Sequence, residues 1–162
     1  MFLIGIGAWC VVIFSIRVAV FGNPIHLLVC RADPDVLSAA EEIARHGSAE
    51  RVTDERVFVL LRRFSRLTLL ELGVFLLEVG LLIFLLTSRI LFWLSAALLA
   101  KNLFALGVSM YYARRQSPGT GLLESLRDLP RGVVLMDRVS SLVSAAGFVV
   151  VFLVVAGFLE LS

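Results

Sequence analysis

The sequence predicts an all-α integral membrane protein with four transmembrane helices in a bundle, and three observations lead to that fold class. Apolar residues make up 59% of the chain and charged residues only 17%, whereas soluble domains average roughly half and a quarter. The mean hydropathy is +0.96. Four apolar stretches reach the roughly 20 residues that a helix needs to cross a hydrocarbon core of about 30 Å. We therefore treat residues 1–162 as a single membrane domain.

The four predicted spans are residues 2–22, 67–87, 90–112 and 139–160. The second and third belong to one apolar run from Leu67 to Tyr112, which is too long for a single crossing. Its one plausible turn is Thr87-Ser88-Arg89, so we expect an antiparallel helical hairpin there.

The first span ends at Gly22-Asn23-Pro24, because glycine caps helix ends and proline disfavours helix at the residue before it. A cleaved signal sequence is the alternative interpretation of this segment. It lacks both a basic leading region and an Ala-x-Ala-like cleavage site, so we interpret it as a retained helix.

Arginines are concentrated in two segments, residues 23–66 and 113–138, and the positive-inside rule makes both of them cytoplasmic loops. The chain ends and the hairpin tip are then outside. The expected location is a cell membrane of the bacterial inner-membrane type.

Both loops contain patterns that predict amphipathic cytoplasmic helices. In the first, Asp33-Pro34 starts a helix that Gly47 ends, and a second helix starts after Thr53 and continues into the second span. In the second, a short helix over residues 122–129 stops at Pro130. The seven arginines of residues 23–66 are matched by seven acids, which argues against nucleic-acid binding.

Small residues recur on one face of several spans, and such faces let helix backbones approach closely in lipid. The candidate packing residues are Gly5, Ala8, Ser15, Ala19 and Gly22 in the first span, Gly73 and Gly80 in the second, and Ser144 and Gly147 in the fourth. These faces predict contacts with other helices, either inside one bundle or with another protein. The expected partners are the lipid bilayer and either further membrane subunits or a homo-oligomer.

The only lysine of the chain, Lys101, is about twelve residues into the third span, close to the membrane midplane. An unpaired charge there costs a few kcal/mol. Folding the hairpin about Ser88 places Glu78 at nearly the same depth, so we expect Lys101 to pair with Glu78 and Asn102 to add an interhelical hydrogen bond.

Glu71 lies seven residues before Glu78 and at a depth similar to that of Arg17 in the first span. Depth alone therefore allows an ion pair between Arg17 and Glu71. The alternative is that Arg17 extends to the inner headgroups without a partner.

Lys101 has two possible roles. A lysine that pairs with a glutamate between helices acts as a structural clamp, which is the interpretation that we favour. A desolvated lysine can also lose its proton, as a proton relay or ion-coupled transporter requires, whereas an arginine cannot.

Motifs for chemistry are sparse. His26 and Cys30 share a helix face but do not complete a metal-site pattern, and we find no nucleophile, phosphate-binding or dinucleotide motif. We predict no catalytic residue, metal or cofactor. The favoured function is a non-enzymatic subunit that packs into or stabilises a larger membrane complex. The alternative is a small proton- or ion-coupled transporter or channel that acts as a homo-oligomer around the Lys/Glu pair. A membrane enzyme ranks third.

Overall fold

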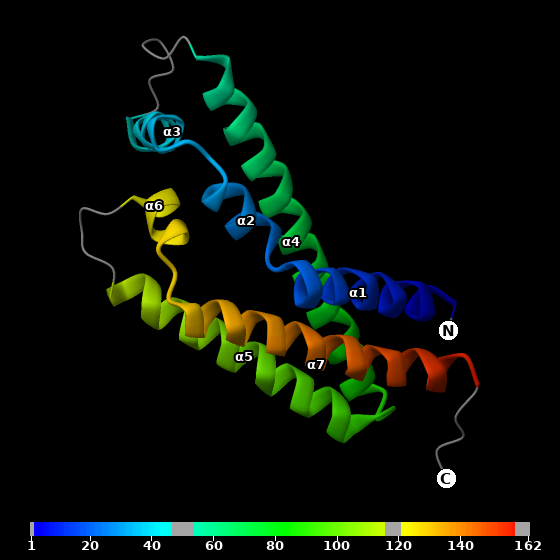
Figure 1. Cartoon of the computed structure of the whole chain (residues 1–162). Helices are drawn as coiled ribbons and strands as arrows, with labels where there is room; N and C mark the ends of the chain where they lie inside the picture. Colours follow the sequence, from blue (N-terminus) through cyan, green and yellow to red (C-terminus); the bar gives the residue numbers. More distant parts are fainter. Residues whose placement is uncertain (1, 47–53, 116–120, 158–162) are drawn as a thin grey trace.

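The computed structural model describes residues 2–46, 54–115 and 121–157, and these ranges contain helices and no strand (Figure 1). The helices are α1 (Phe2–Phe21), α2 (Pro24–Cys30), α3 (Pro34–His46), α4 (Glu55–Thr87), α5 (Phe92–Arg115), α6 (Leu122–Arg127) and α7 (Arg131–Val155). Within the described chain, four helical segments are long and apolar enough to cross a membrane: Phe2–Cys30, Glu55–Thr87, Phe92–Tyr112 and Arg131–Val155. The predicted all-helical class is therefore confirmed, as is the prediction of four helices long and apolar enough to cross a membrane.

α1 and α7 pack side by side in antiparallel directions. Near the start of α1, the Trp9 ring lies 5.4 Å from the Phe152 ring near the end of α7. At the end of α1, the Arg138 guanidinium of α7 lies beside Gly22. The start of α1 and the end of α7 therefore lie at the same end of the molecule (Figure 1).

The predicted end of the first span is confirmed in detail. Gly22 follows α1 with a φ of +89°, a left-handed conformation that glycine adopts without a side-chain clash. Asn23 then caps α2, because its Oδ1 accepts hydrogen bonds from the backbone N–H groups of Ile25 and His26 at 2.9 and 3.2 Å. The prediction for residues 23–66 did not include α2, although Asn23-Pro24 is a sequence signal for a helix start.

α4 runs without interruption through the predicted lead-in helix and the second span, as expected from the absence of a breaker. The turn after it is longer than Thr87-Ser88-Arg89, because residues 88–91 form turns and α5 starts at Phe92 rather than at residue 90. Arg89 and Leu91 have φ values of 56° and 55°. No glycine stands at either position, which explains why the sequence did not indicate this turn geometry.

The fourth predicted span, residues 139–160, starts too late. α7 begins at Arg131 directly after Pro130, so Asp137 and Arg138 lie within the helix rather than in the predicted loop of residues 113–138. α5 also extends past residue 112 to Arg115. α6 is shorter than the predicted helix of residues 122–129, and the predicted stops at Gly47 and at residue 160 lie outside the described residues.

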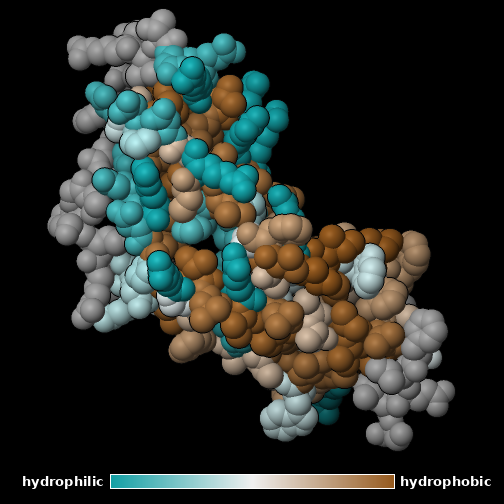
Figure 2. Space-filling model, in the orientation of Figure 1, coloured by the Kyte–Doolittle hydropathy of each residue, from teal (hydrophilic) through white to brown (hydrophobic). Residues whose placement is uncertain are grey.

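Two apolar clusters stabilise the described chain. The first lies among α1, α4, α5 and α7 and includes Val11, Leu82, Leu98 and Phe148. The second lies among α2, α3, α4 and α6. Figure 2 shows hydrophilic residues over the part of the molecule that carries α2, α3 and the start of α4, and hydrophobic residues over α1 and α7. One end of the molecule thus has the surface of an aqueous region and the other has that of a lipid-facing region.

Candidate functional site

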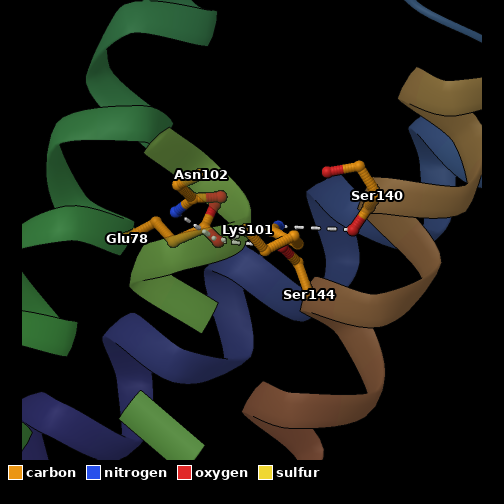
Figure 3. Close-up of polar contacts among 5 residues, drawn as sticks. All are labelled: Glu78, Lys101, Asn102, Ser140 and Ser144. Atoms are coloured by element: carbon orange, nitrogen blue, oxygen red, sulfur yellow. Dashed lines mark hydrogen bonds and ion pairs between the residues drawn. The ribbon is translucent and has the colours of Figure 1, made fainter. Parts of the chain in front are cut away.

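A polar network at the centre of the long helices joins α4, α5 and α7 (Figure 3). Lys101 Nζ lies 3.6 Å from Glu78 Oε1. The same ammonium donates hydrogen bonds to the Ser140 carbonyl oxygen at 3.3 Å and to the Ser144 hydroxyl. The Lys101 side chain is 19% exposed and the Glu78 side chain 11%, so the contact is largely shielded from the surroundings.

Glu78 receives two further hydrogen bonds. Its Oε1 accepts from Asn102 Nδ2 at 3.1 Å and from the Ser144 hydroxyl at 2.8 Å. Ser144 therefore accepts from Lys101 and donates to Glu78, and both its hydroxyl proton and a lone pair are used. The carboxylate is balanced by one cation and by two neutral donors, which is the environment that a charge needs at this depth.

Local helix geometry explains how these side chains meet. Lys101 and Asn102 are consecutive on α5 and point about 100° apart, so Asn102 turns to α4 while Lys101 reaches both α4 and α7. Ser140 and Ser144 are one turn apart and share a face of α7. The structure thus brings together Lys101, Glu78 and Asn102, as the sequence predicted.

Arg17 and Glu71, in contrast, do not meet. No ion pair joins them within the described residues, and Arg17 is exposed on α1. Ser15 and Val18 are the buried residues at this end of α1, and Arg17 lies well around the helix from both. A similar distance from the span ends does not bring the two side chains together, because Arg17 points away from the buried side of α1.

Glu71 instead lines two cavities that start at the polar network. The first has a volume of about 250 Å³ and includes Lys101, Glu78 and Asn102 in its wall. The second has a volume of about 440 Å³ and extends to His26 and Tyr112. The two cavities share six lining residues, namely Asn23, Glu71, Ala105, Ser109, Asp137 and Ser140. Glu71 Oε1 is buried and has no hydrogen-bond partner in the described chain.

Asp137 is a cavity residue that sequence reasoning missed. It was assigned to the loop of residues 113–138, yet it lies in the second turn of α7 and contributes to both cavities. The signal that would have found it is Pro130, because a proline directly before an apolar run marks a helix start. The cavity wall thus carries three carboxylates, Glu71, Glu78 and Asp137, together with Lys101.

The small residues of α1 and α7 lie mostly at contacts within the chain. Ala8 and Ser15 are buried, and Ala19 is half-buried. A Cβ on Gly5 would lie 4.0 Å from the Phe152 ring, and one on Gly147 would lie 2.6 Å from Leu98.

The two candidate glycines of α4 differ from those of α1 and α7. Gly73 and Gly80 are exposed, and a Cβ on either would meet no atom within 4 Å. They are seven residues apart and therefore lie on one face of α4. The surface of α4 directly over the two glycines is unoccupied in the described chain, whereas Leu77, which lies between them, packs against α1 at Gly7.

His26 and Cys30 lie together on α2, with Cys30 Sγ 3.5 Å from His26 Nε2. The residues that the structure describes contain no group of three or more potential metal ligands. Cys10 and Cys30 are both free thiols.

Comparison with protein-family models, with curated proteins and with solved structures gave no match for this chain. The functional interpretation therefore rests on the geometry alone.

Proposed function

We propose that the protein is a non-enzymatic integral membrane subunit that packs into or stabilises a larger membrane complex. The observation that carries this proposal is the unoccupied face of α4 around Gly73 and Gly80. In lipid, small residues at regular spacing serve helix association, because they allow close backbone approach. The candidate packing glycines of α1 and α7 already have neighbours within the chain, as Gly147 has Leu98.

The polar network fits the same proposal as an internal clamp. Lys101 is satisfied by acceptors on α4 and α7 of its own chain, so no partner charge is required to stabilise it. A clamp of this kind fixes the register of the three helices. The outer face of α4 is then presented in a defined orientation to a helix of the partner.

The proposal includes the finer arrangement in the membrane. The four spans form one bundle, the amphipathic helices of the two loops lie on the cytoplasmic side, and both chain ends lie outside, in a membrane of the bacterial inner-membrane type. The supporting observations are the antiparallel pairing of α1 with α7 and the arginine content of both loops.

The test replaces the α4 glycines with a bulky residue. Gly73→Leu combined with Gly80→Leu fills the unoccupied face without a clash inside the chain, because a Cβ at either position meets open space. We expect the isolated variant to fold and the native complex to be lost when membranes are extracted in mild detergent. Gly107→Leu on α5 is the matched control, since its Cβ also meets no atom within 4 Å, and it should leave the complex intact. Survival of the complex in the double variant would reject the α4 face as the contact.

A second candidate function, a proton- or ion-coupled transporter, is favoured by the two connected cavities. They provide a polar route of three carboxylates and a lysine from the network to His26. Intramembrane ionisable groups are a common feature of such routes. A single chain with four spans encloses little of a pathway, so this function requires a homo-oligomer.

The transporter alternative is tested by flux. The protein is reconstituted into liposomes that contain a pH-sensitive dye, and proton entry is compared among the wild type, Glu78→Gln and the control Glu124→Gln. Glu124 is an exposed carboxylate outside both cavities. A relay through Glu78 predicts flux that is abolished only in the first variant. Absence of flux in the wild type, or equal flux in all three proteins, would reject the transporter.

A further inference from the structure

A cleft of about 810 Å³ lies where the end of α1, all of α2 and the first half of α4 meet. It is distinct from the two cavities at the polar network, with which it shares no lining residue. Its wall carries five arginines: Arg17, Arg31, Arg56, Arg63 and Arg66. Asp33 is the one acidic residue in the lining.

The five arginines are available to a ligand. Each is exposed, and none of them forms an ion pair within the described part of the chain. With Asp33 subtracted, the cleft carries a formal charge of +4. Guanidinium groups form paired hydrogen bonds to phosphate oxygens, so a cluster of unpaired arginines favours a phosphate-bearing ligand.

The walls between the arginines are apolar. Phe21, Leu27, Val59 and Leu67 contribute to the lining, and Phe21 and Val59 are exposed to the extent of 68% and 43%. A free inorganic anion gains no binding energy from such an apolar surface. A ligand with acyl chains does gain binding energy there, because its chains remove the apolar side chains from water.

The position of the cleft also fits a lipid. Arg17 and Arg66 lie at the cytoplasmic ends of the first and second spans of the proposed orientation, which is the level of the headgroups. Arg56 is ten residues before Arg66 on α4, about 15 Å further from the bilayer at 1.5 Å per residue. The arginines therefore extend over more than one phosphate group.

We propose that this cleft binds the headgroup of an anionic phospholipid, and that a lipid with two phosphates binds more tightly than a lipid with one. Arg17, Arg63 and Arg66 contact one phosphate group, and Arg31 and Arg56 contact the other. Basic pockets between membrane helices on the cytoplasmic side are suited to such headgroups. Bound lipid would link α1 to α4 from the aqueous side of the membrane.

The test uses the full chain, purified in mild detergent and freed of lipid. It is mixed with equal amounts of cardiolipin, phosphatidylglycerol and phosphatidylcholine, and bound lipid is counted by native mass spectrometry. We expect retention in that order, with phosphatidylcholine not retained above background. Equal retention of all three lipids would overturn the proposal.

Two variants of α4 locate the binding. Arg63→Gln removes a cleft arginine and should weaken cardiolipin retention about fivefold, the value expected for roughly 1 kcal/mol per arginine near an anionic headgroup. Arg62→Gln is the matched control, because Arg62 is exposed on the same helix but does not line the cleft, and it should retain cardiolipin like the wild type. Helicity measured by circular dichroism confirms that both variants are folded. Equal loss in both variants, or loss in neither, would contradict binding at this site.

A final arm separates a lipid from a soluble phosphate ligand. Pyrophosphate is added to the cardiolipin complex at increasing concentration. The proposal predicts that cardiolipin stays bound at a large excess of pyrophosphate, since the acyl chains contribute part of the affinity. Displacement at equal concentration would assign the cleft to a soluble phosphate compound and overturn the lipid assignment.

Discussion

Replacement of Lys101 by methionine tests the polar network most sharply. Methionine is an unbranched side chain one atom shorter than lysine, and it lacks the ammonium that lies 3.6 Å from Glu78 Oε1. The Glu78 carboxylate, with an exposed side-chain fraction of 11%, then has no cation. Removal of one partner of a buried ion pair costs about 3–5 kcal/mol. Because Asn102 and Ser144 still donate to Glu78, we expect the lower value, about 3 kcal/mol.

The double variant Lys101→Met with Glu78→Leu removes both charges. It leaves the Asn102 amide and the Ser144 hydroxyl without their carboxylate acceptor, and a buried donor left unsatisfied costs about 1–3 kcal/mol. At the lower end of that range for each donor the total loss is about 2 kcal/mol, less than that of Lys101→Met alone. The single variant Glu78→Leu completes the cycle and should also lose about 3 kcal/mol, because it leaves the lysine unpaired.

The assay is reversible unfolding in mixed detergent and sodium dodecyl sulfate, followed by far-ultraviolet circular dichroism. The coupling free energy is the difference between the loss in the double variant and the sum of the losses in the two single variants. A double variant that loses at least about 2 kcal/mol less than that sum supports the clamp, since coupling between interacting residues usually reaches about 0.5–3 kcal/mol. Additive losses, to within about 0.5 kcal/mol, would refute it.

Three further predictions concern packing, turn geometry and Arg17. Gly147→Ala places a Cβ 2.6 Å from Leu98 Cδ1 and should lower the free energy of unfolding by about 1 kcal/mol. Gly107→Ala has open space around its Cβ and should cost nothing. Equal effects of the two substitutions would contradict the close approach of α5 and α7. Arg89→Gly relieves a φ of 56° and should stabilise the α4–α5 hairpin by up to about 1 kcal/mol, and a loss in the same unfolding assay would argue against that turn conformation. Arg17→Gln in lipid-free detergent should change the free energy of unfolding by less than about 0.5 kcal/mol, since no ion pair to Glu71 is present in the described chain. A loss above about 2 kcal/mol would indicate that Arg17 and Glu71 do form an ion pair.

The pairing of Lys101 with Glu78 was predictable from the sequence, and the orientation of Arg17 relative to Glu71 was not. Lys101 and Glu78 are 13 and 10 residues from Ser88, and a hairpin with one short turn leaves little freedom in that register. Arg17 and Glu71 lie on helices far apart in the chain, so no turn fixes the rotation of one relative to the other. The sequence therefore supported the first pair and left the second open.

The boundaries of the spans depended on local signals of different strength. Gly22 and Asn23 are residues that end and start helices, and the structure uses both as predicted for the end of the first span. The start of α7 was wrong by eight residues because Asp137 and Arg138 resemble loop residues in a hydropathy window. They are instead helical residues in the second turn of α7, and Asp137 is part of the cavity wall.

The free face of α4 could be predicted only in part. The spacing of Gly73 and Gly80 identified a packing face, as did that of the small residues in α1. No residue pattern in the sequence decides which of these faces α7 occupies. That choice depends on the complementarity of whole helix surfaces, which single-residue patterns do not contain.

The most direct test of the proposed subunit function is the native mass of the protein extracted from its own membrane in mild detergent, with every component identified. The account predicts that the 17.8 kDa chain is found in a hetero-assembly of defined composition. A monomer, or a closed homo-oligomer with no other component, would contradict it, and the homo-oligomer would favour the transporter.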